Sequence, residues 1–148
     1  MKTIDTKSYL DALCEIANQG NCVSTVVAGA SMTPFLSGGR DFVYLESPSR
    51  KLRKGDIVLF LRDDGRYVLH RIRYIRKDGY YMVGDRQTVT EGPVTPSQIK
   101  ALVTGAKRKG KELSPKSPLW LFFSKVWIRI VPLRPAILAT LYPPRIQH

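Results

Sequence analysis

Hydrophobic and polar positions along this chain of 148 residues change their spacing twice. Near the N-terminus the apolar residues recur at helical intervals, which predicts an amphipathic helix over residues 7–19 that ends at Gly20 or Asn21. After residue 22 the pattern consists of short runs that are β-branched or that alternate between apolar and polar, as is typical of strands. From residue 117 the chain is aromatic-rich, apolar and interrupted by prolines.

The middle of the chain predicts a β domain. We expect six strands, at residues 23–28, 41–46, 56–62, 66–75, 80–85 and 99–109. The Asp64-Gly65 pair and residues 77–79 are turn signals, whereas residues 86–98, with two prolines, are expected to form a loop. One helix followed by short strands favours a mainly β fold of the barrel or sandwich kind.

The predicted elements divide the chain into three parts. They are an N-terminal helix (1–22), a β domain (23–112) and a basic, aromatic-rich amphipathic tail (113–148). This division is a prediction from composition and periodicity.

The tail leaves three interpretations open. Residues 119–142 have the length of a membrane span, but Lys125, Arg129 and Arg134 lie within them, and each central charge costs about 2.5–3.5 kcal/mol on insertion scales. Residues 118–131 instead predict an amphipathic helix with cations on one side and aromatic rings mostly on the other. Such a helix suits the plane of a membrane surface, or it packs on the domain or on a partner chain; a true span is least favoured.

Charge is concentrated in the same region. The net charge is +12, with +3 over residues 1–99 and +9 over residues 100–148. A basic tail suits an anionic membrane surface, although it also serves solubility around an apolar segment. We recognise no nucleic-acid-binding motif, and the aromatic residues lie in an apolar segment, so no nucleic-acid partner is expected.

Several other classes of protein are disfavoured. The N-terminal residues include acidic side chains and lack a continuous apolar core, so they do not form a signal peptide. Cys14 and Cys22 are expected to be free thiols, and no cluster of histidines and cysteines has metal-ligand spacing. We therefore expect no metal or cofactor, and a cytoplasmic or peripherally membrane-associated protein without a clear transmembrane span.

Ser31 and His70 are the first candidates for chemistry. Ser31 follows Gly29 and Ala30 at a predicted corner, and a serine becomes a strong nucleophile only when a base takes its proton. His70 and His148 are the two histidines of the chain, and His148 is its last residue. Alternation places His70 on the apolar, inward side of its strand, where both a core histidine and a catalytic base remain open.

Five short motifs occur in order with short spacings. They are GASMTPFL, GRDFVYLE, KGDIVLF, VLHRI and VGDRQTVTEGPV. In this order they resemble the type I signal peptidases, a clan that includes the self-cleaving repressors of the SOS response. The resemblance covers residues 23–105 approximately. It implies a coiled β-sheet or partial barrel, and a serine endopeptidase that cleaves a leader or signal peptide from a peptide or preprotein substrate.

The resemblance also implies roles for individual residues. It implies that Ser31 is the nucleophile and that His70 is the base, since the strand carries histidine where many members of the family have lysine. Asp85 matches the acidic position that orients the base, with Glu91 as a supporting or alternative acid. Arg71 cannot serve as the base because its guanidinium stays protonated.

The oxyanion and substrate-binding positions follow from the same motif. They are Gly29, Ala30, Ser31 and Met32, with the Ser31 N–H as oxyanion donor. Many relatives add a serine hydroxyl where this chain has Gly29, and the family's N-terminal membrane anchor has no counterpart in the residues given. These departures motivate an alternative, a catalytically inactive module that binds peptides or the membrane surface.

Overall fold

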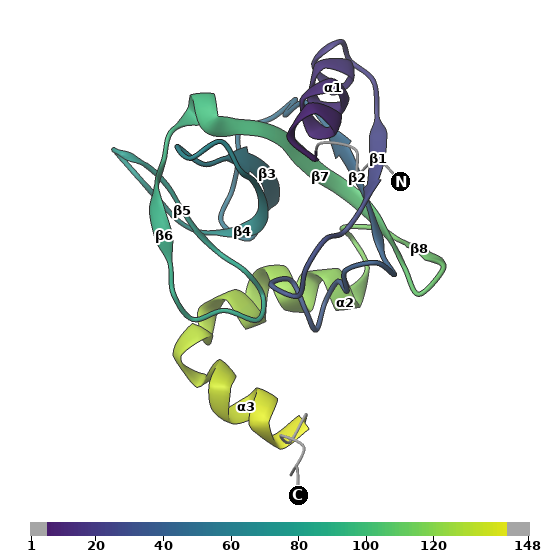
Figure 1. The fold of residues 1–148 in the computed structure, drawn as a ribbon. Coiled ribbons are helices and arrows are strands. Elements are labelled where there is room, and N and C mark those ends of the chain that lie inside the picture. The colour runs from purple at the N-terminus through teal and green to yellow at the C-terminus, as the bar shows by residue number, and fades with distance from the viewer. Residues whose placement is uncertain (1–5, 142–148) are drawn as a thin grey trace, which may run out of the picture.

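A computed structural model describes residues 6–141 of the protein. Figure 1 shows a strongly curved antiparallel sheet with a helix at one end and a helical C-terminal segment at the other. The N-terminal helix is α1 (Thr6–Asn18). The strands are β1 (Val23–Val26), β2 (Phe42–Glu46), β3 (Ile57–Leu61), β4 (Tyr67–Arg76), β5 (Gly79–Val83), β6 (Glu91–Val94), β7 (Ile99–Arg108) and β8 (Lys111–Leu113).

The sheet is open. Its strand order is β1-β2-β7-β3-β4-β5-β6, and β8 pairs with β7. β1 and β6 are therefore edge strands, and the sheet does not close into a barrel. The late strand β7 lies between β2 and β3 and pairs antiparallel with both. The predicted mainly β fold with an N-terminal helix and a C-terminal helical segment is confirmed.

Most predicted strands correspond to observed ones, but the expected loop at residues 86–98 contains β6 and a 3₁₀ turn (Pro96–Gln98). β6 includes Pro93, and its pairing with β5 joins Tyr80 to Val94 and Met82 to Glu91. An edge strand tolerates a proline because one side of its backbone has no partner to receive an N–H bond. The short strand β8 was not predicted either.

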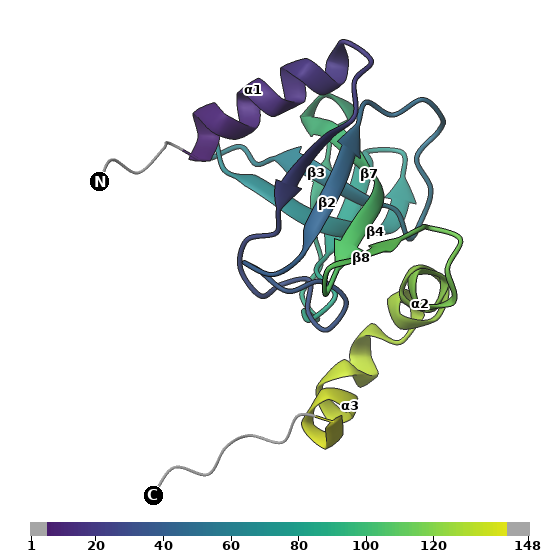
Figure 2. The same cartoon turned by 90° about the vertical axis from the view of Figure 1, so that its right-hand side faces the viewer.

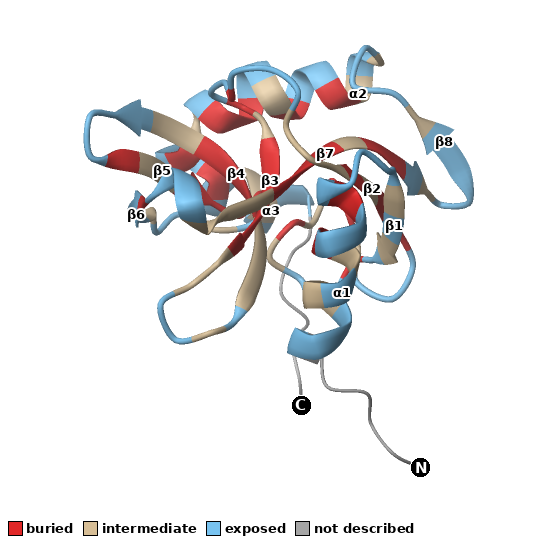
Figure 3. Ribbon diagram, turned by 90° about the horizontal axis from the view of Figure 1, so that it is seen from above, coloured by how far each residue is buried: buried red, intermediate tan, exposed pale blue. Residues whose placement is uncertain are grey.

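The core has two main parts, and successive residues of β3 alternate between them. Figure 3 shows buried positions on the central strands β3, β4 and β7. The larger cluster joins the sheet to α1 through Cys14 and to the C-terminal segment through Trp120, Phe123 and Trp127. The smaller cluster lies around Phe60 and Ile72. α1 and the C-terminal segment thus stabilise the same sheet from opposite ends (Figure 2).

The tail packs on the domain. It consists of α2 (Pro118–Leu121), a π-helical turn (Phe122–Val126), two 3₁₀ turns (Trp127–Arg129 and Val131–Leu133) and α3 (Arg134–Leu141). The predicted helical tail is therefore confirmed, although residues 118–131 change from α to π to 3₁₀ period along their length. The buried side chains are Trp120, Phe123, Trp127, Ile128, Val131 and Arg134.

None of the helices between residues 6 and 141 combines the length and apolarity that crossing a bilayer requires.

Candidate active site

Ser31 lies in the segment that connects β1 and β2, close to its start. Gly29 has a φ of +74°, and a Cβ on Gly38 would lie 2.3 Å from the Gly29 carbonyl oxygen. These two glycines allow the segment to fold tightly on itself, which leaves Ser31 half-buried and Ala30 exposed. Met32, predicted to contact substrate, is 2% exposed and its side chain packs in the larger core, so that role is withdrawn for its side chain.

His70 faces Ser31 from β4. Its strand is held by β3, where Val58 is its register partner, and its ring packs edge-on against Phe60 at 6.1 Å between centroids. His70 is only 2% exposed. Its Nε2 lies 3.2 Å from the Ser31 Oγ, at the long end of hydrogen-bond reach. The structure therefore brings together two predicted site residues separated by β2 and β3 in the sequence.

The other ring nitrogen of His70 faces Glu91. Nδ1 lies 3.6 Å from the Glu91 Oε1, just beyond hydrogen-bond length, and it has no partner among the described residues. Both carboxylate oxygens of Glu91 accept bonds from Arg62, at 2.6 and 3.0 Å. A buried imidazole N–H normally finds an acceptor, and the Glu91 carboxylate is the group placed to supply one.

The surroundings keep His70 neutral at physiological pH. Burial lowers the pKa of His70 to about 4, because desolvation disfavours the imidazolium. The negative charge of Glu91 opposes this shift, while the positive charge of Arg62 adds to it. A neutral imidazole is the form that can accept a proton from a serine hydroxyl.

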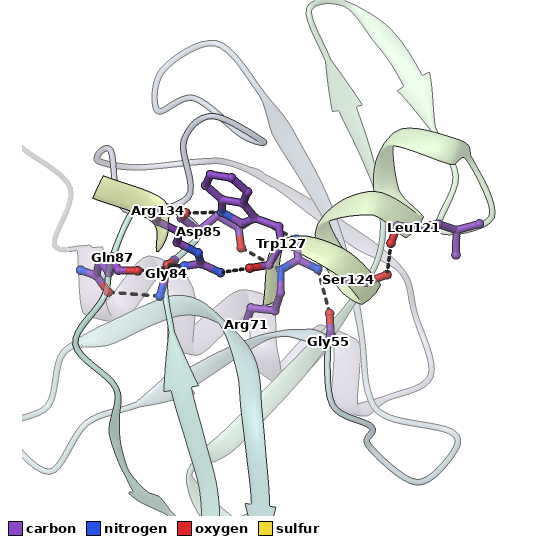
Figure 4. Close-up of polar contacts among 9 residues, drawn as sticks. All are labelled: Gly55, Arg71, Gly84, Asp85, Gln87, Leu121, Ser124, Trp127 and Arg134. Atoms are coloured by element: carbon purple, nitrogen blue, oxygen red, sulfur yellow. Dashed lines mark hydrogen bonds and ion pairs between the residues drawn. The ribbon is translucent and has the colours of Figure 1, made fainter. Parts of the chain in front are cut away.

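Asp85 has a different partner from the one predicted. Its two carboxylate oxygens accept bonds from the Arg71 Nε and Nη2 at 2.8 and 2.9 Å, and both side chains are fully buried. Arg71 also donates to the Gly55 carbonyl oxygen at 2.8 Å (Figure 4). Arg71 thus engages both oxygens of Asp85, as Arg62 does those of Glu91, but the carboxylate that lies 3.6 Å from the His70 Nδ1 is that of Glu91.

The segment 84–87 contacts the backbone of Ser31. The Arg86 N–H donates to the Ser31 carbonyl oxygen at 2.9 Å. A Cβ on Gly84 would lie 2.5 Å from that same oxygen, so only glycine allows this approach. The Gln87 side chain closes the turn by accepting the Gly84 N–H at 3.1 Å. The Gly84-Asp85 motif therefore braces the backbone of the candidate nucleophile.

The Ser31 backbone N–H is suited to an oxyanion role. Within residues 6–141 no acceptor bonds this N–H, so it could donate to a developing negative charge. Gly29 offers no hydroxyl to assist it.

A largely apolar cleft of about 530 Å³ leads to Ser31 and His70. Its walls come from several elements: Tyr9 and Leu10 from α1, Val26 from the edge strand β1, and Leu69 from β4. A cleft next to an unpaired strand edge can accept an extended peptide, whose backbone bonds to the edge while side chains enter the cleft.

Sequence reasoning missed Arg62, Gln87 and the contribution of α1 to this cleft. Arg62 ends a buried strand beside a hairpin turn, where an exposed arginine is commonplace, and its partner Glu91 lies on another strand. No motif of the chain links these positions. Among the described residues no cluster of histidine, cysteine or acidic side chains could hold a metal ion.

Comparisons with known proteins give one partial match. No protein-family model matches the chain, and no solved structure matches it. A similar curated protein is signal peptidase I W of Bacillus subtilis (strain 168), which is 29% identical over 91 residues. The match covers 58% of this chain and 48% of that protein, so the chain spans about half the length of the relative. It supports a signal-peptidase-like family, and the antiparallel β fold agrees with it.

Proposed function

We propose that the protein is a serine endopeptidase that cleaves a leader or signal peptide. The observation that carries this proposal is the 3.2 Å approach of the Ser31 Oγ to the Nε2 of a buried His70, at the end of an apolar cleft. The similarity to a signal peptidase supports the reaction class.

In the proposed reaction, His70 takes the hydroxyl proton as the Ser31 Oγ attacks the carbonyl carbon of the scissile bond. The Ser31 N–H donates to the oxyanion. His70 then gives its proton to the departing amine, which leaves an acyl-enzyme on Ser31. A water molecule, deprotonated by His70, attacks this ester, and His70 returns the proton to the Ser31 Oγ as the new carboxylate leaves. Glu91 accepts the His70 Nδ1–H and stabilises the transient imidazolium, so it moves slightly closer than its resting distance of 3.6 Å.

The direct test is cleavage of a synthetic leader peptide by the full chain. We expect Ser31→Ala and His70→Ala each to lower kcat by at least about 10³-fold, as loss of a nucleophile or base does in serine hydrolases. Ser49→Ala and His148→Ala are matched controls. Ser49 is exposed in the loop between β2 and β3, and His148 lies outside the described residues. Cleavage that survives both Ser31→Ala and His70→Ala would refute the proposal.

The inactive-module alternative makes a different prediction in the same experiment. A protein that binds the peptide, yet neither cleaves it nor becomes acylated at Ser31 by a serine-reactive phosphonate, would be a peptide-binding module. The neutral state of His70 beside Ser31 favours the enzyme, because a binding role gives no reason to bury an imidazole there.

We also propose that the tail contacts an anionic membrane surface. Its outer side carries exposed apolar side chains, Phe122 and Val126, next to the exposed cations Lys125 and Arg129. Exposed apolar groups beside cations are typical of interfacial helices. The inner side of the same segment packs on the sheet. Packing on the domain and lying on a membrane surface, the two interpretations that the sequence favoured, are therefore compatible.

A further inference from the structure

Arg134 is the most unusual buried charge of the tail. Its side chain is fully buried at the start of α3, and it has no carboxylate partner among the described residues. Burial lowers the pKa of its guanidinium to about 10, which still leaves it charged at neutral pH. Burying an arginine without an ion-pair partner costs free energy. The groups that accept its hydrogen bonds therefore indicate its role.

Those bonds converge on the segment that supports Ser31. Nη1 donates to the carbonyl oxygens of Gly84 and Gln87 at 2.8 and 2.9 Å. Nη2 donates to the Trp127 carbonyl oxygen at 3.1 Å, and the guanidinium lies 5.2 Å from the centre of the Trp127 ring. Figure 4 shows Arg134 and Trp127 gathered around this segment.

Trp127 adds a third bond to the same segment. Its indole N–H donates to the Asp85 carbonyl oxygen at 2.6 Å. The tail therefore bonds the carbonyl groups of Gly84, Asp85 and Gln87. The same segment contacts the Ser31 carbonyl oxygen through Gly84 and the Arg86 N–H. The segment 84–87 is thus fixed between the tail and the candidate nucleophile.

We propose that Arg134, together with Trp127, is a positioning residue that sets the place of Ser31 relative to His70 through the segment 84–87. The inference rests on the proposed peptidase function and assigns the tail a part in it. A displacement of about 1 Å at a reacting group can cost about 100-fold in rate, so loosening this support lowers kcat rather than peptide binding. Apart from Gln87, the residues that line the cleft lie outside this segment, so we expect KM to change much less than kcat.

The test compares full-length Arg134→Gln and Trp127→Phe with Arg66→Gln, a change at an exposed arginine between β3 and β4. Trp127→Phe keeps an aromatic ring but removes the indole N–H together with part of the buried ring system. We expect Arg134→Gln to lower kcat by about 10- to 100-fold and Trp127→Phe by several-fold, with KM within about twofold of wild type. Arg66→Gln should cleave as wild type does.

Hydrogen exchange supplies a readout independent of activity. We expect faster exchange at the Arg86 amide, which bonds to Ser31, in Arg134→Gln and Trp127→Phe, with exchange in the central strand β7 unchanged. If Arg134→Gln does not fold, Trp127→Phe decides the question.

Two results would overturn the inference. One is wild-type kcat in the folded variants. The other is a loss of kcat accompanied by equal acceleration of exchange in β7, which indicates general destabilisation. A wild-type chain that cleaves nothing would contradict the proposed function instead, and the exchange data would still report whether Arg134 orders residues 84–87.

Discussion

At the scale of single residues, the site depends on a balance of charge around a buried imidazole. Glu91 lies next to the His70 Nδ1, but its carboxylate is shared with Arg62. The carboxylate raises the pKa of His70, the guanidinium lowers it, and burial lowers it most. His70 is therefore held neutral while a negative charge stays nearby, which suits the imidazolium of the proposed reaction.

This balance predicts the pH dependence of cleavage. Because the pKa of His70 is lowered to about 4, kcat/KM of the wild type should persist below pH 6.5 and fall only as His70 becomes protonated near pH 4. Glu91→Gln removes the charge that raises this pKa, so the acid limb should move to lower pH. Its plateau kcat should fall by at least about tenfold, because the imidazolium loses its counter-charge.

A pH-rate profile of each variant checks this prediction. Glu15→Gln, a change at an exposed glutamate of α1, is the matched control and should reproduce the wild-type curve. An acid limb that moves to higher pH in Glu91→Gln would contradict the proposed place of Glu91 beside His70.

At the scale of elements, the site depends on close approaches of backbone segments. The segment that bears Ser31 contacts the turn at Gly84, and the turn at Gly55 contacts the tail, where a Cβ would lie 2.4 Å from the Ser124 carbonyl oxygen. Gly55 also has a φ of +96°, which other residues rarely adopt. The glycines of two sequence motifs thus serve contacts between segments rather than chemistry.

Gly84→Ala tests this view at the nucleophile. The added methyl would lie 2.5 Å from the Ser31 carbonyl oxygen and 3.1 Å from its Cβ, so the backbone at residue 84 and at Ser31 must move apart. We expect kcat to fall by about 10- to 100-fold in peptide cleavage. Gly105→Ala in β7 is the control, because its nearest contact is a side-chain atom of Tyr44 at 3.2 Å, which can move aside. Wild-type kcat in Gly84→Ala would show that Ser31 tolerates the displacement.

Local pattern was enough to predict α1 and the strands rich in β-branched residues, because their periodicity follows directly from burial of one face. Local pattern was not enough to predict β6, because Pro93 disfavours a strand and this strand is stabilised by its pairing with β5. Periodicity also predicted the helical tail, but not the π and 3₁₀ turns within it.

The same contrast holds for the site. Ser31 and His70 could be proposed because they lie in short motifs that occur in a fixed order. Glu91 and Asp85 could both be proposed as the orienting acid, but ranking Glu91 first required the knowledge that its carboxylate lies 3.6 Å from the His70 Nδ1. Arg134 gave no signal at all, because its role depends on carbonyl groups that any residue can supply.

At the scale of the whole molecule, the tail has an inner and an outer side. The inner side reaches the site through Arg134, while the outer side exposes apolar and cationic groups. The strongly positive part of the chain is residues 100–148. We therefore propose that the outer side of the tail binds an anionic bilayer.

Co-sedimentation of the full chain with lipid vesicles tests whether the outer side of the tail binds a membrane. We expect binding to vesicles that contain phosphatidylglycerol, little binding to pure phosphatidylcholine, and weaker binding at high salt. Val126→Ser should weaken binding several-fold, because it removes apolar surface from the interface. Val89→Ser, at an exposed valine outside the tail, should not. Equal binding to both vesicle types, or an equal effect of the two substitutions, would contradict a membrane-facing tail.

The place of β7 in the sheet has a consequence for the order in which the protein is made. During synthesis β2 and β3 emerge early, yet both need β7 as a neighbour. Until residues 99–108 have left the ribosome, the two strands cannot join into one sheet, and their unpaired edges are open to mispairing. Ser31 and His70 reach each other through that joined sheet. A nascent chain therefore has no assembled site until β7 has been translated, and the support from Arg134 comes later still.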